Sequence, residues 1–318
     1  MFANSFVQQT LQAPGAGVKA LLETRAGARL QRRRVRREIT REWDRLSVGS
    51  EATGYPIVSF LCSRLATRVD EEKRVFILGS GASVMELTEE HWREVRRSPS
   101  IGFGAWPLHP FVPDMLAFSP TRGLSDYEAV FTRVMARDDI VEAAPEVILL
   151  RSSLAEDIEM YSRLPEAHRT RASIYGRISL LSRTSAGLHR EVMQFLADPG
   201  SANFGITLDS GSTLIRLISF AIRSGAREIV LLGVDLNTPG YFWDSNPEIL
   251  RTNGFESFFT GQSGSRHGTM TDSRRPLPVD VVIAAIHKVF SDLTGGNISI
   301  GSQYSALAQH LPVHRWGA

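Results

Sequence analysis

Residues 74–83 read RVFILGSGAS, an apolar run that ends in a turn of glycine and serine. Residues 228–235 have the same texture, because EIVLLGVD is a continuous apolar run that ends in a glycine and an acid. Continuous rather than alternating apolarity indicates strands buried on both faces, as in a parallel sheet covered by helices. The two runs therefore predict an α/β fold with a doubly wound, mainly parallel sheet.

Strands and helices are expected to alternate along most of the chain, as in a single Rossmann-like nucleotide-binding domain over residues 71–318. Further strands are predicted at 100–105, 114–119, 146–150 and 297–301, and helices at 86–96, 125–137, 212–224, 279–293 and 304–311. Between about residues 237 and 278 the chain has no sustained period and is rich in Asn, Gly, Ser and Pro. Such a stretch within a compact domain predicts an irregular lid.

Residues 1–70 differ from the rest and predict a basic, helical N-terminal extension. Apolar residues recur about every four positions at Leu30, Val35, Ile39, Trp43 and Leu46. Arginines cover the other faces, at positions 29, 32, 33, 34, 36, 37, 41 and 45. We favour a helix docked on its own domain over a helix anchored to anionic lipid. Nucleic acid is the third choice, because no aromatic stacking platform is interleaved with the arginines.

Composition and charge exclude several classes of protein. The chain has 318 residues, 42% of them hydrophobic, and a formal net charge of +2, so neither global disorder nor a strong overall field is expected. Its one cysteine, Cys62, excludes an internal disulfide and a Cys-rich zinc site. No apolar run approaches the roughly 20 residues of a membrane span, and no signal-peptide pattern opens the chain. We expect a cytoplasmic protein, peripheral at the inner membrane face if the arginine helix binds lipid.

The turn after the first predicted strand is a candidate phosphate site at Gly79, Ser80, Gly81 and Ser83. Small residues between a strand and a helix let backbone N–H groups approach a phosphate. The turn lacks the full Rossmann glycine spacing and no lysine follows it, which disfavours hydride transfer and ATP hydrolysis. A tight structural turn without a ligand is the alternative interpretation.

Three further segments place polar residues where ligands bind in open α/β sheets. Ser210 and Gly211 open a predicted helix, where they act either as a helix cap or as a ligand contact. Asp235 and Asn237 follow the second apolar run, and Ser119 ends the predicted strand 114–119. These residues join the candidate nucleotide site.

Asp235 could contact a ribose, hold a loop or bind a metal. No second carboxylate lies beside it at a metal-binding spacing, although Asp244 and Asp272 could meet it in space. We therefore expect no obligatory metal.

Two segments of the predicted lid carry reactive side chains, Tyr241-Phe242-Trp243-Asp244 and 266–272 (RHGTMTD). His267 lies in the second, a polar and glycine-containing stretch. An imidazole titrates near neutrality and is the usual group for removing a proton from a hydroxyl, and a nearby carboxylate fixes its tautomer. His267 is thus the candidate general base, although a lone histidine is more often structural.

Taken together and in this order, these segments resemble the bacterial sialyltransferases of glycosyltransferase family 42, which use CMP-sialic acid. The resemblance covers roughly residues 73–312. It includes the turn at 78–83, the helix and strand from Ser210 to Asp235, the tyrosine segment at 241–244, the histidine segment at 267–272 and the C-terminal region 298–312.

The resemblance implies an inverting glycosyltransferase that moves sialic acid, or a related 2-keto sugar acid, from a CMP-activated donor to a hydroxyl of a glycan acceptor. His267 would be the general base, and Tyr241 would donate a hydrogen bond to the departing phosphate. The turn around Ser80 and the helix start at Ser210 and Gly211 would hold the cytidine and its phosphate. Such enzymes need no metal or other cofactor, because tyrosine hydroxyls replace the cation.

The chain departs from the family in ways that keep alternatives open. The family has asparagine where this chain has Ser80, and a second tyrosine near the position of Asn237. The run 102–105 offers no amide, and an insertion follows the histidine segment at 273–278. A different nucleotide sugar, a non-catalytic nucleotide-binding protein of the same fold and a pyrophosphokinase-like enzyme are the alternatives. A homo-oligomer and a glycan or glycolipid acceptor are further expectations.

Overall fold

The computed structural model describes residues 25–58, 73–118, 133–150, 162, 164–198, 205–237, 240–255 and 277–317. Several predictions fall outside these ranges. Among them are the first part of the predicted helix 125–137, the end of the predicted strand 114–119 and the histidine segment at 266–272.

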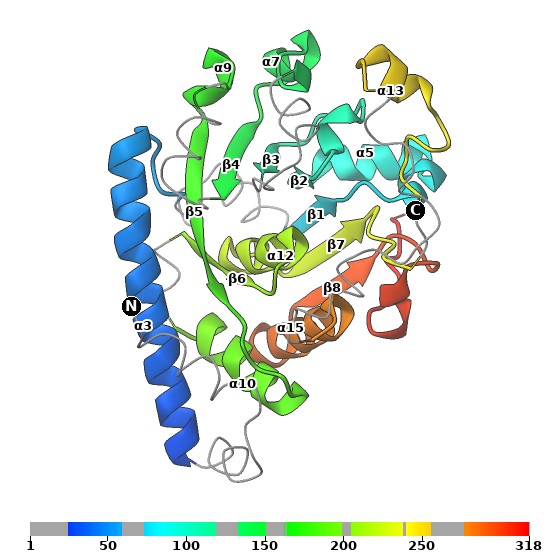
Figure 1. Cartoon of the computed structure of the whole chain (residues 1–318). Helices are drawn as coiled ribbons and strands as arrows, with labels where there is room; N and C mark the ends of the chain where they lie inside the picture. The colour runs from blue at the N-terminus through cyan, green and yellow to red at the C-terminus, as the bar shows by residue number, and fades with distance from the viewer. Residues whose placement is uncertain are drawn as a thin grey trace.

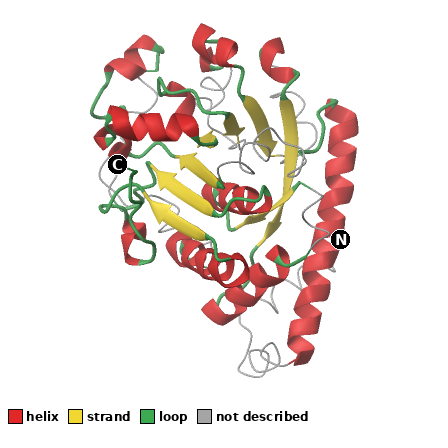
Figure 2. Cartoon of the chain, turned by 180° about the vertical axis from the view of Figure 1, so that it is seen from behind, coloured by secondary structure: helices red, strands yellow, loops and turns green. Residues whose placement is uncertain are grey.

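The fold is α/β and is built on one eight-stranded sheet in which every neighbouring pair is parallel. The strand order is β6-β5-β4-β3-β2-β1-β7-β8, and helices lie around the sheet (Figure 2). The strands are β1 (Arg74–Leu78), β2 (Ser100–Phe103), β3 (Met115–Phe118), β4 (Glu146–Leu150), β5 (Ala172–Ser179), β6 (Ile206–Asp209), β7 (Glu228–Leu232) and β8 (Asn297–Ile300). This confirms the predicted doubly wound parallel sheet.

The strand order reverses direction beside β1. From β1 the chain adds β2 to β6 outward on one side, and it then crosses over to add β7 and β8 on the other side. The gap between the carboxyl ends of β1 and β7 is therefore the topological switch point of the sheet, where ligands bind in open α/β folds.

Eight α-helices lie within the described residues. They are α3 (Arg25–Thr53), α5 (Glu89–Arg97), α7 (Asp138–Ala143), α9 (Glu166–Arg169), α10 (Ser185–Leu196), α12 (Thr213–Arg223), α13 (Glu248–Thr252) and α15 (Val279–Thr294). Three short 3₁₀ helices accompany them: η1 (Ala82–Glu86), η2 (Trp106–Leu108) and η4 (Ala306–Gln309).

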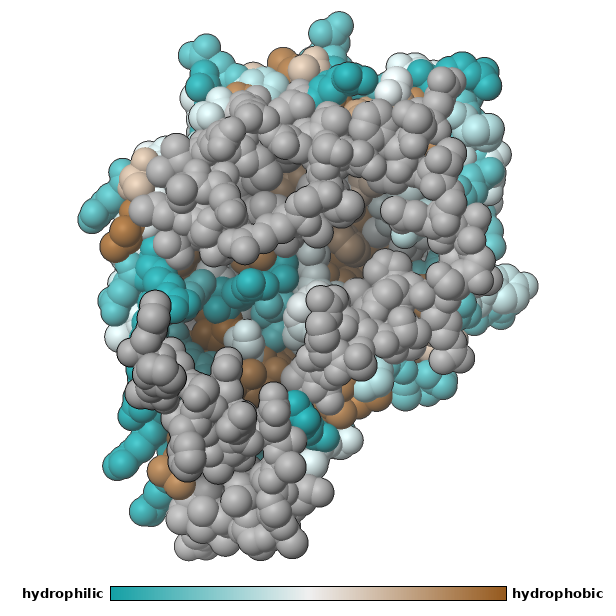
Figure 3. Space-filling view, viewed as in Figure 1, coloured by the Kyte–Doolittle hydropathy of each residue, from teal (hydrophilic) through white to brown (hydrophobic). Residues whose placement is uncertain are grey.

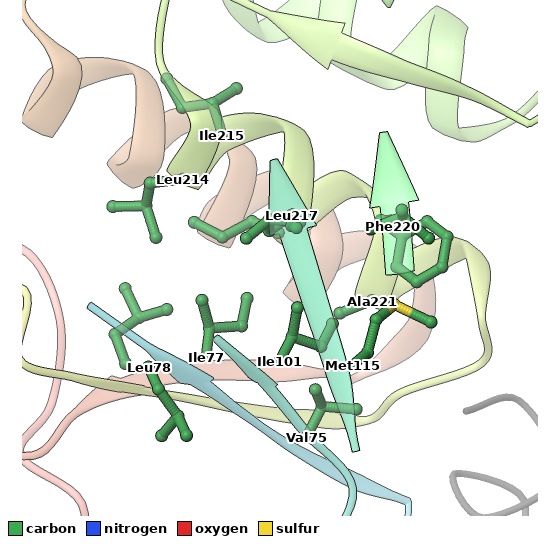
Figure 4. Packing of buried hydrophobic residues seen from close by; sticks show 14 of the residues in the cluster. Val75, Ile77, Leu78, Ile101, Met115, Leu214, Ile215, Leu217, Phe220 and Ala221 are labelled. Atoms are coloured by element: carbon green, nitrogen blue, oxygen red, sulfur yellow. The ribbon is translucent and has the colours of Figure 1, made fainter. Parts of the chain in front are cut away.

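Helix α12 is the crossover that carries the chain back over the centre of the sheet. It is apolar nearly all round, and Leu214, Leu217 and Phe220 are buried. Figure 4 shows this face of α12 packed over Ile77, Leu78 and neighbouring side chains of the central strands. Leu214, next to the start of α12, lies over Leu78 at the end of β1, which brings the beginning of α12 toward the switch point.

Helix α3 docks on the flank of the molecule, against β5, β6 and α10 (Figure 1). Val35, Ile39 and Leu46 are buried in this contact, which confirms the prediction of a helix docked on its own domain. Trp43 is only partly buried, and Leu30 is 54% exposed although it was expected in the apolar stripe. Figure 3 shows hydrophilic residues along the edge of the molecule where α3 lies.

Several element boundaries differ from the prediction for identifiable reasons. Strands β2 and β7 end before the predicted positions because Gly104 and Gly233 have φ angles of +66° and +63°, which extended strands do not adopt. Helix α5 starts at Glu89 rather than at residue 86, because Thr88 forms a capping box there. The predicted helix 304–311 is the single 3₁₀ segment η4.

Strands β5 and β6 and helix α10 were not predicted from the sequence. Strand β5 reads ASIYGRIS and mixes polar with apolar residues, because its central part packs against α3 while its end pairs with β6. A side chain on Gly176 would collide with Glu42 and Leu46 of α3. The glycine that lets α3 approach this strand therefore also weakens its sequence signal.

Candidate functional site

The loops that follow β1 and β7 cross at the switch point. The Gly79 N–H donates to the Leu232 carbonyl at 2.8 Å, and the Gly81 N–H donates to the Gly233 carbonyl at 2.8 Å. A Cβ on Gly79 would lie 2.6 Å from the Gly233 carbonyl oxygen. Close approach of the two backbones thus requires glycine, so a structural reason accounts for part of the glycine pattern.

Ser80 lies between the crossing loops and the end of β2. Its carbonyl accepts a hydrogen bond from the Phe242 N–H at 3.1 Å. Its hydroxyl oxygen is 3.7 Å from the position that a Cβ on Gly104 would occupy. The Ser80 side chain therefore faces the carboxyl ends of β1 and β2 and is only partly buried.

Asp235 and Ser83 bond to each other across 152 residues of sequence. The Ser83 N–H donates to one carboxylate oxygen of Asp235 at 3.0 Å, and the Ser83 hydroxyl donates to the other. Both residues are predicted nucleotide contacts. Their side chains fasten the start of η1 to the loop after β7, which is the loop-holding role considered for Asp235.

Asn237 and the C-terminal segment brace the same loop from the other side. The Asn237 side-chain amide donates to the Tyr304 carbonyl. The Ser305 hydroxyl donates to the Val234 carbonyl at 2.6 Å, and the Ala306 N–H donates to the Asp235 carbonyl at 2.8 Å. The segment after β8 thus holds the loop after β7 in place through these hydrogen bonds.

The tyrosine segment is attached directly to the glycine turn. Tyr241 and Gly81 form an antiparallel bridge, and the Ala82 N–H donates to the Gly240 carbonyl at 3.0 Å. Phe242 is fully buried and anchors the segment. These contacts place the segment 240–242 beside the turn after β1.

The Tyr241 ring stacks on a neighbouring ring, and the Tyr241 backbone is bonded to a carboxylate. It stacks on Trp243 with ring centroids 4.5 Å apart and an interplanar angle of 8°. The Tyr241 N–H donates to the Asp244 carboxylate at 2.8 Å. Burial, and then the negative charge of Asp244, raise the pKa of Tyr241. The phenol is therefore protonated at neutral pH, the form in which its hydroxyl can donate a hydrogen bond.

The start of α12 rests on a buried charged cluster. Asp209 accepts hydrogen bonds from the Gly211 N–H at 2.8 Å, from Arg216 at 3.0 Å and from Arg177 at 2.7 Å. Gly211 has a φ of +80°, which favours glycine in this turn. The N–H of Gly211 is thus used within the protein, while Ser210 follows the end of β6 beside it.

Arg177 and Arg216 were missed by the sequence analysis. Arg216 is 4% exposed and makes the cluster cationic, because two guanidinium groups face one carboxylate. An arginine between the apolar pairs of the helix sequence TLIRLISFAIR was the available signal. Arg177 had no such signal, because strand β5 itself was not recognised.

His267 and Ser119 lie outside the described residues, as does Asp272. The contacts of the other predicted site residues divide them into two groups. The turn at Gly79–Gly81, the Ser83–Asp235 pair, Asn237 and Tyr241 are joined around the switch point, and Ser210–Gly211 belong to the start of α12. Within the described ranges no group of three or more His, Cys, Asp or Glu side chains could hold a metal ion.

Comparison with known proteins gives structural matches only. No family model and no curated protein sequence matches this chain. Among solved structures, the MAf glycosyltransferase from Magnetospirillum magneticum AMB-1 matches with a TM-score of 0.46 and 16% identity, over 83% of this chain. The match covers 37% of that protein, so this chain spans little more than a third of its length.

The sialyltransferase CstII from Campylobacter jejuni matches over most of the chain. Its complex with CMP gives a TM-score of 0.40 and 12% identity, covering 76% of this chain and 85% of that chain. A CstII complex with a trisaccharide acceptor and CMP gives 0.41 and 12%, covering 76% and 86%. These similarities to glycosyltransferase structures have low sequence identity and TM-scores below 0.5, whereas the Rossmann-like character of this chain rests on its own parallel sheet.

Proposed function

We propose that this protein is an inverting glycosyltransferase that moves sialic acid, or a related 2-keto sugar acid, from a CMP-activated donor to a hydroxyl of a glycan acceptor. The observation that supports it most is the attachment of the Tyr241 segment to the glycine turn at the switch point. This joins a protonated phenol to the part of an open α/β sheet where nucleotides bind.

In this proposal the residues divide the work of nucleotide binding. Ser80 and the backbone of Gly79 and Gly81 line the cytidine site, together with Ser119. Ser210 and Gly211, above the cationic Asp209 cluster, lie toward the phosphate, which the positive end of α12 favours. Ser83, Asp235 and Asn237 act by holding the loops in place. The lid is residues 237–278 of the domain 71–318.

Tyr241 and His267 carry out the chemistry in this proposal. The acceptor hydroxyl loses its proton to His267 as its oxygen attacks the anomeric carbon, and the bond from that carbon to the CMP phosphate breaks. Tyr241 donates a hydrogen bond to the phosphate oxygen on which negative charge develops. A donor aimed at developing charge lowers the barrier more than it tightens ground-state binding.

The direct test is release of CMP from CMP-sialic acid, with and without lactose as acceptor. We expect acceptor-dependent release, and a shift in thermal unfolding with CMP that exceeds those with UDP, GDP or ATP. His267→Ala should abolish release while CMP still raises the unfolding temperature. His189→Ala, on α10 and away from the switch point, is the matched control and should leave both unchanged.

Tyr241→Phe tests the leaving-group contact. It should lower kcat by about 10²-fold with a much smaller change in KM, because the lost bond strengthens only as the phosphate departs. Tyr304→Phe removes a second phenol from the same edge of the sheet and should be neutral. CMP binding without any turnover in the unaltered protein would favour the non-catalytic alternative, and a preference for UDP, GDP or ATP would change the donor.

We also propose that α3 contacts anionic lipid at the inner membrane face. It contains nine arginines against four acidic residues, and its apolar line is used in docking. Arg33, Arg37 and Arg41 are exposed on the outer side. Each basic residue near an anionic surface contributes about 1 kcal/mol. No described helix is long and apolar enough to cross a bilayer.

Vesicle sedimentation distinguishes this contact from simple solvation of the helix. Binding to vesicles of phosphatidylglycerol, absent with phosphatidylcholine and weakened by salt, is expected. Changing Arg33, Arg37 and Arg41 to Glu should lower binding at least tenfold, whereas Arg93→Glu on α5 should not. In Figure 1, β1 and β7 point away from α3, so a bound chain would present the candidate site to the solvent.

A further inference from the structure

A cavity of about 550 Å³ lies at the amino edge of the sheet, opposite the switch point. Its polar and charged lining comes from the first residue of β2, from the residue before β3 and from α5, and prolines complete the wall next to β4. The lining side chains that matter for its chemistry are Glu89, Trp92, Arg96, His109, Phe111 and Asp114. Its size is within the range of sites for small ligands.

Aromatic rings form one side of the cavity. Trp92 and Phe111 stack with centroids 5.0 Å apart and an interplanar angle of 29°, and both rings are partly exposed. Trp106 lies behind them with its indole N–H bonded to the Phe111 carbonyl at 3.0 Å. These contacts fix the position of the exposed rings, so the aromatic surface is formed before any ligand arrives.

Hydrogen-bonding groups of both signs surround this aromatic surface. Arg96 and Glu89 form an ion pair at the rim, with side chains 47% and 66% exposed. The Asp114 carboxylate accepts the Ser100 N–H at 2.9 Å and is itself only partly buried. The rim therefore carries a guanidinium group and carboxylates around the ring platform.

His109 at the back of the cavity is a neutral group. Burial, and then the charge of Arg137, lower the pKa of His109 to about 4. Its Nδ1 accepts the Phe111 N–H at 3.0 Å, so the proton of the neutral ring is on Nε2. The cavity floor thus carries no charge at neutral pH, which suits an uncharged ligand.

We propose that this cavity is a second ligand site and binds a pyranose ring of a neutral carbohydrate. A pyranose has an apolar C–H face that packs on an aromatic ring, and an edge of hydroxyls that both donate and accept. The stacked rings match the face, and Arg96 with Glu89 and Asp114 match the edge. A purely apolar ligand would leave the charged rim without a role.

The cavity is connected to the candidate transferase site through one layer of rings. His109 meets Phe242 edge to face with centroids 5.1 Å apart, and Trp106 meets it at 6.0 Å. Phe242 is the residue after Tyr241. Sugar binding in the cavity is separate from transfer, so failure of the proposed function leaves this proposal standing.

The chain has five tryptophans, so 5-fluorotryptophan labelling gives five ¹⁹F resonances for a binding test. We titrate the full chain with lactose, maltose and methyl glucoside, and assign Trp92 with Trp92→Phe. A saturable shift of the Trp92 resonance is expected, with a Kd of about 10 mM or below, while Trp43 on α3 does not shift. No shift for any of the three sugars at about 50 mM would overturn the proposal.

Two variants separate the site from its surroundings. Arg96→Gln should weaken sugar binding at least threefold, whereas Arg93→Gln, one turn earlier on α5 but outside the cavity, should not. Trp92→Ala, read by ligand-detected saturation transfer, should weaken it at least tenfold. Unchanged binding by Trp92→Ala, or tighter binding of cytidine than of sugar with the same Trp92 shift, would also overturn it.

Discussion

The two edges of the central strands differ in the residues that form them: glycines at the carboxyl edge and large aromatic side chains at the amino edge. At the carboxyl edge, the loops after β1 and β7 meet through glycines and backbone hydrogen bonds. At the amino edge, large rings from α5 and from residues 106–111 surround a cavity. The loop crossing at the first edge therefore requires residues without a Cβ, and the second edge depends on the stacking of large side chains.

The largest effect is expected at the loop crossing. Gly233→Ala combines a φ of +63° with a Cβ that collides with the Gly79 carbonyl oxygen, a backbone atom that cannot turn away. We expect a loss of more than about 3 kcal/mol in the free energy of unfolding, measured in urea.

Gly295→Ala is the matched control for the crossing. Its φ is +68° and nothing lies within 4 Å of the added Cβ, so only the backbone cost of about 1–2 kcal/mol applies. Equal losses for the two variants would show that backbone conformation, and not loop contact, sets the requirement for glycine.

A smaller effect, which depends on pH, is expected at the amino edge. The pKa of His109 is about 4 in the folded chain and near 6.5 when unfolded, so the unfolded state binds more protons between these values. Stability contributed by the neutral ring is therefore present above pH 6.5 and is lost as the pH falls toward 4. Between pH 7.5 and pH 5 the loss from this group is about 2 kcal/mol.

His109→Asn isolates this contribution. The Asn oxygen keeps an acceptor for the Phe111 N–H, but the residue no longer titrates. Urea unfolding at the two pH values should then show a smaller loss of unfolding free energy than in the unaltered chain. Part of the pH dependence of stability remains, because the pKa values of His168 and His287 are also lowered. An identical slope would mean that His109 is not buried as a neutral ring.

The smallest effect is expected for Ser83→Ala at the carboxyl edge. It removes one hydrogen bond to Asp235, and the Ser83 N–H keeps the other, so a loss of about 1 kcal/mol is expected. Because this hydroxyl is already bonded within the protein, CMP affinity should change less than twofold. A tenfold loss of affinity without loss of stability would make Ser83 a nucleotide contact instead of a brace.

The contrast between the edges also explains what the sequence reveals. The runs at 74–83 and 228–235 predict buried parallel strands and their loops, because burial on both faces leaves a local signature that needs no knowledge of the partner strand. Strand β6 reads ITLD, in which Thr207 and Asp209 alternate with apolar residues, and β5 is interrupted by Gly176 and Arg177, so neither carries that signature. Their pattern is set by α3 and α12, which are distant in sequence.

The candidate site is predictable only in part for the same reason. The glycine turn and Tyr241 are visible as unusual segments, and their resemblance to one family brings them together. The bond between Ser83 and Asp235 spans 152 residues, and no local pattern indicates it. The aromatic cavity is even less predictable from the sequence, because its rings come from α5 and from the chain between β2 and β3. Each of these rings, taken alone, has the sequence pattern of an ordinary core residue.

The place of β1 between β2 and β7 has a consequence for how the chain is made. Residues 74–78 leave the ribosome about 150 residues before the strand that covers their second edge. At ordinary rates of translation this is a delay of roughly 8 to 30 s. Throughout that delay the nascent protein carries an open, apolar strand edge, which is a target for chaperones and for misassembly. The carboxyl edge at the switch point, which needs both strands, can only be completed after residue 232 has been made.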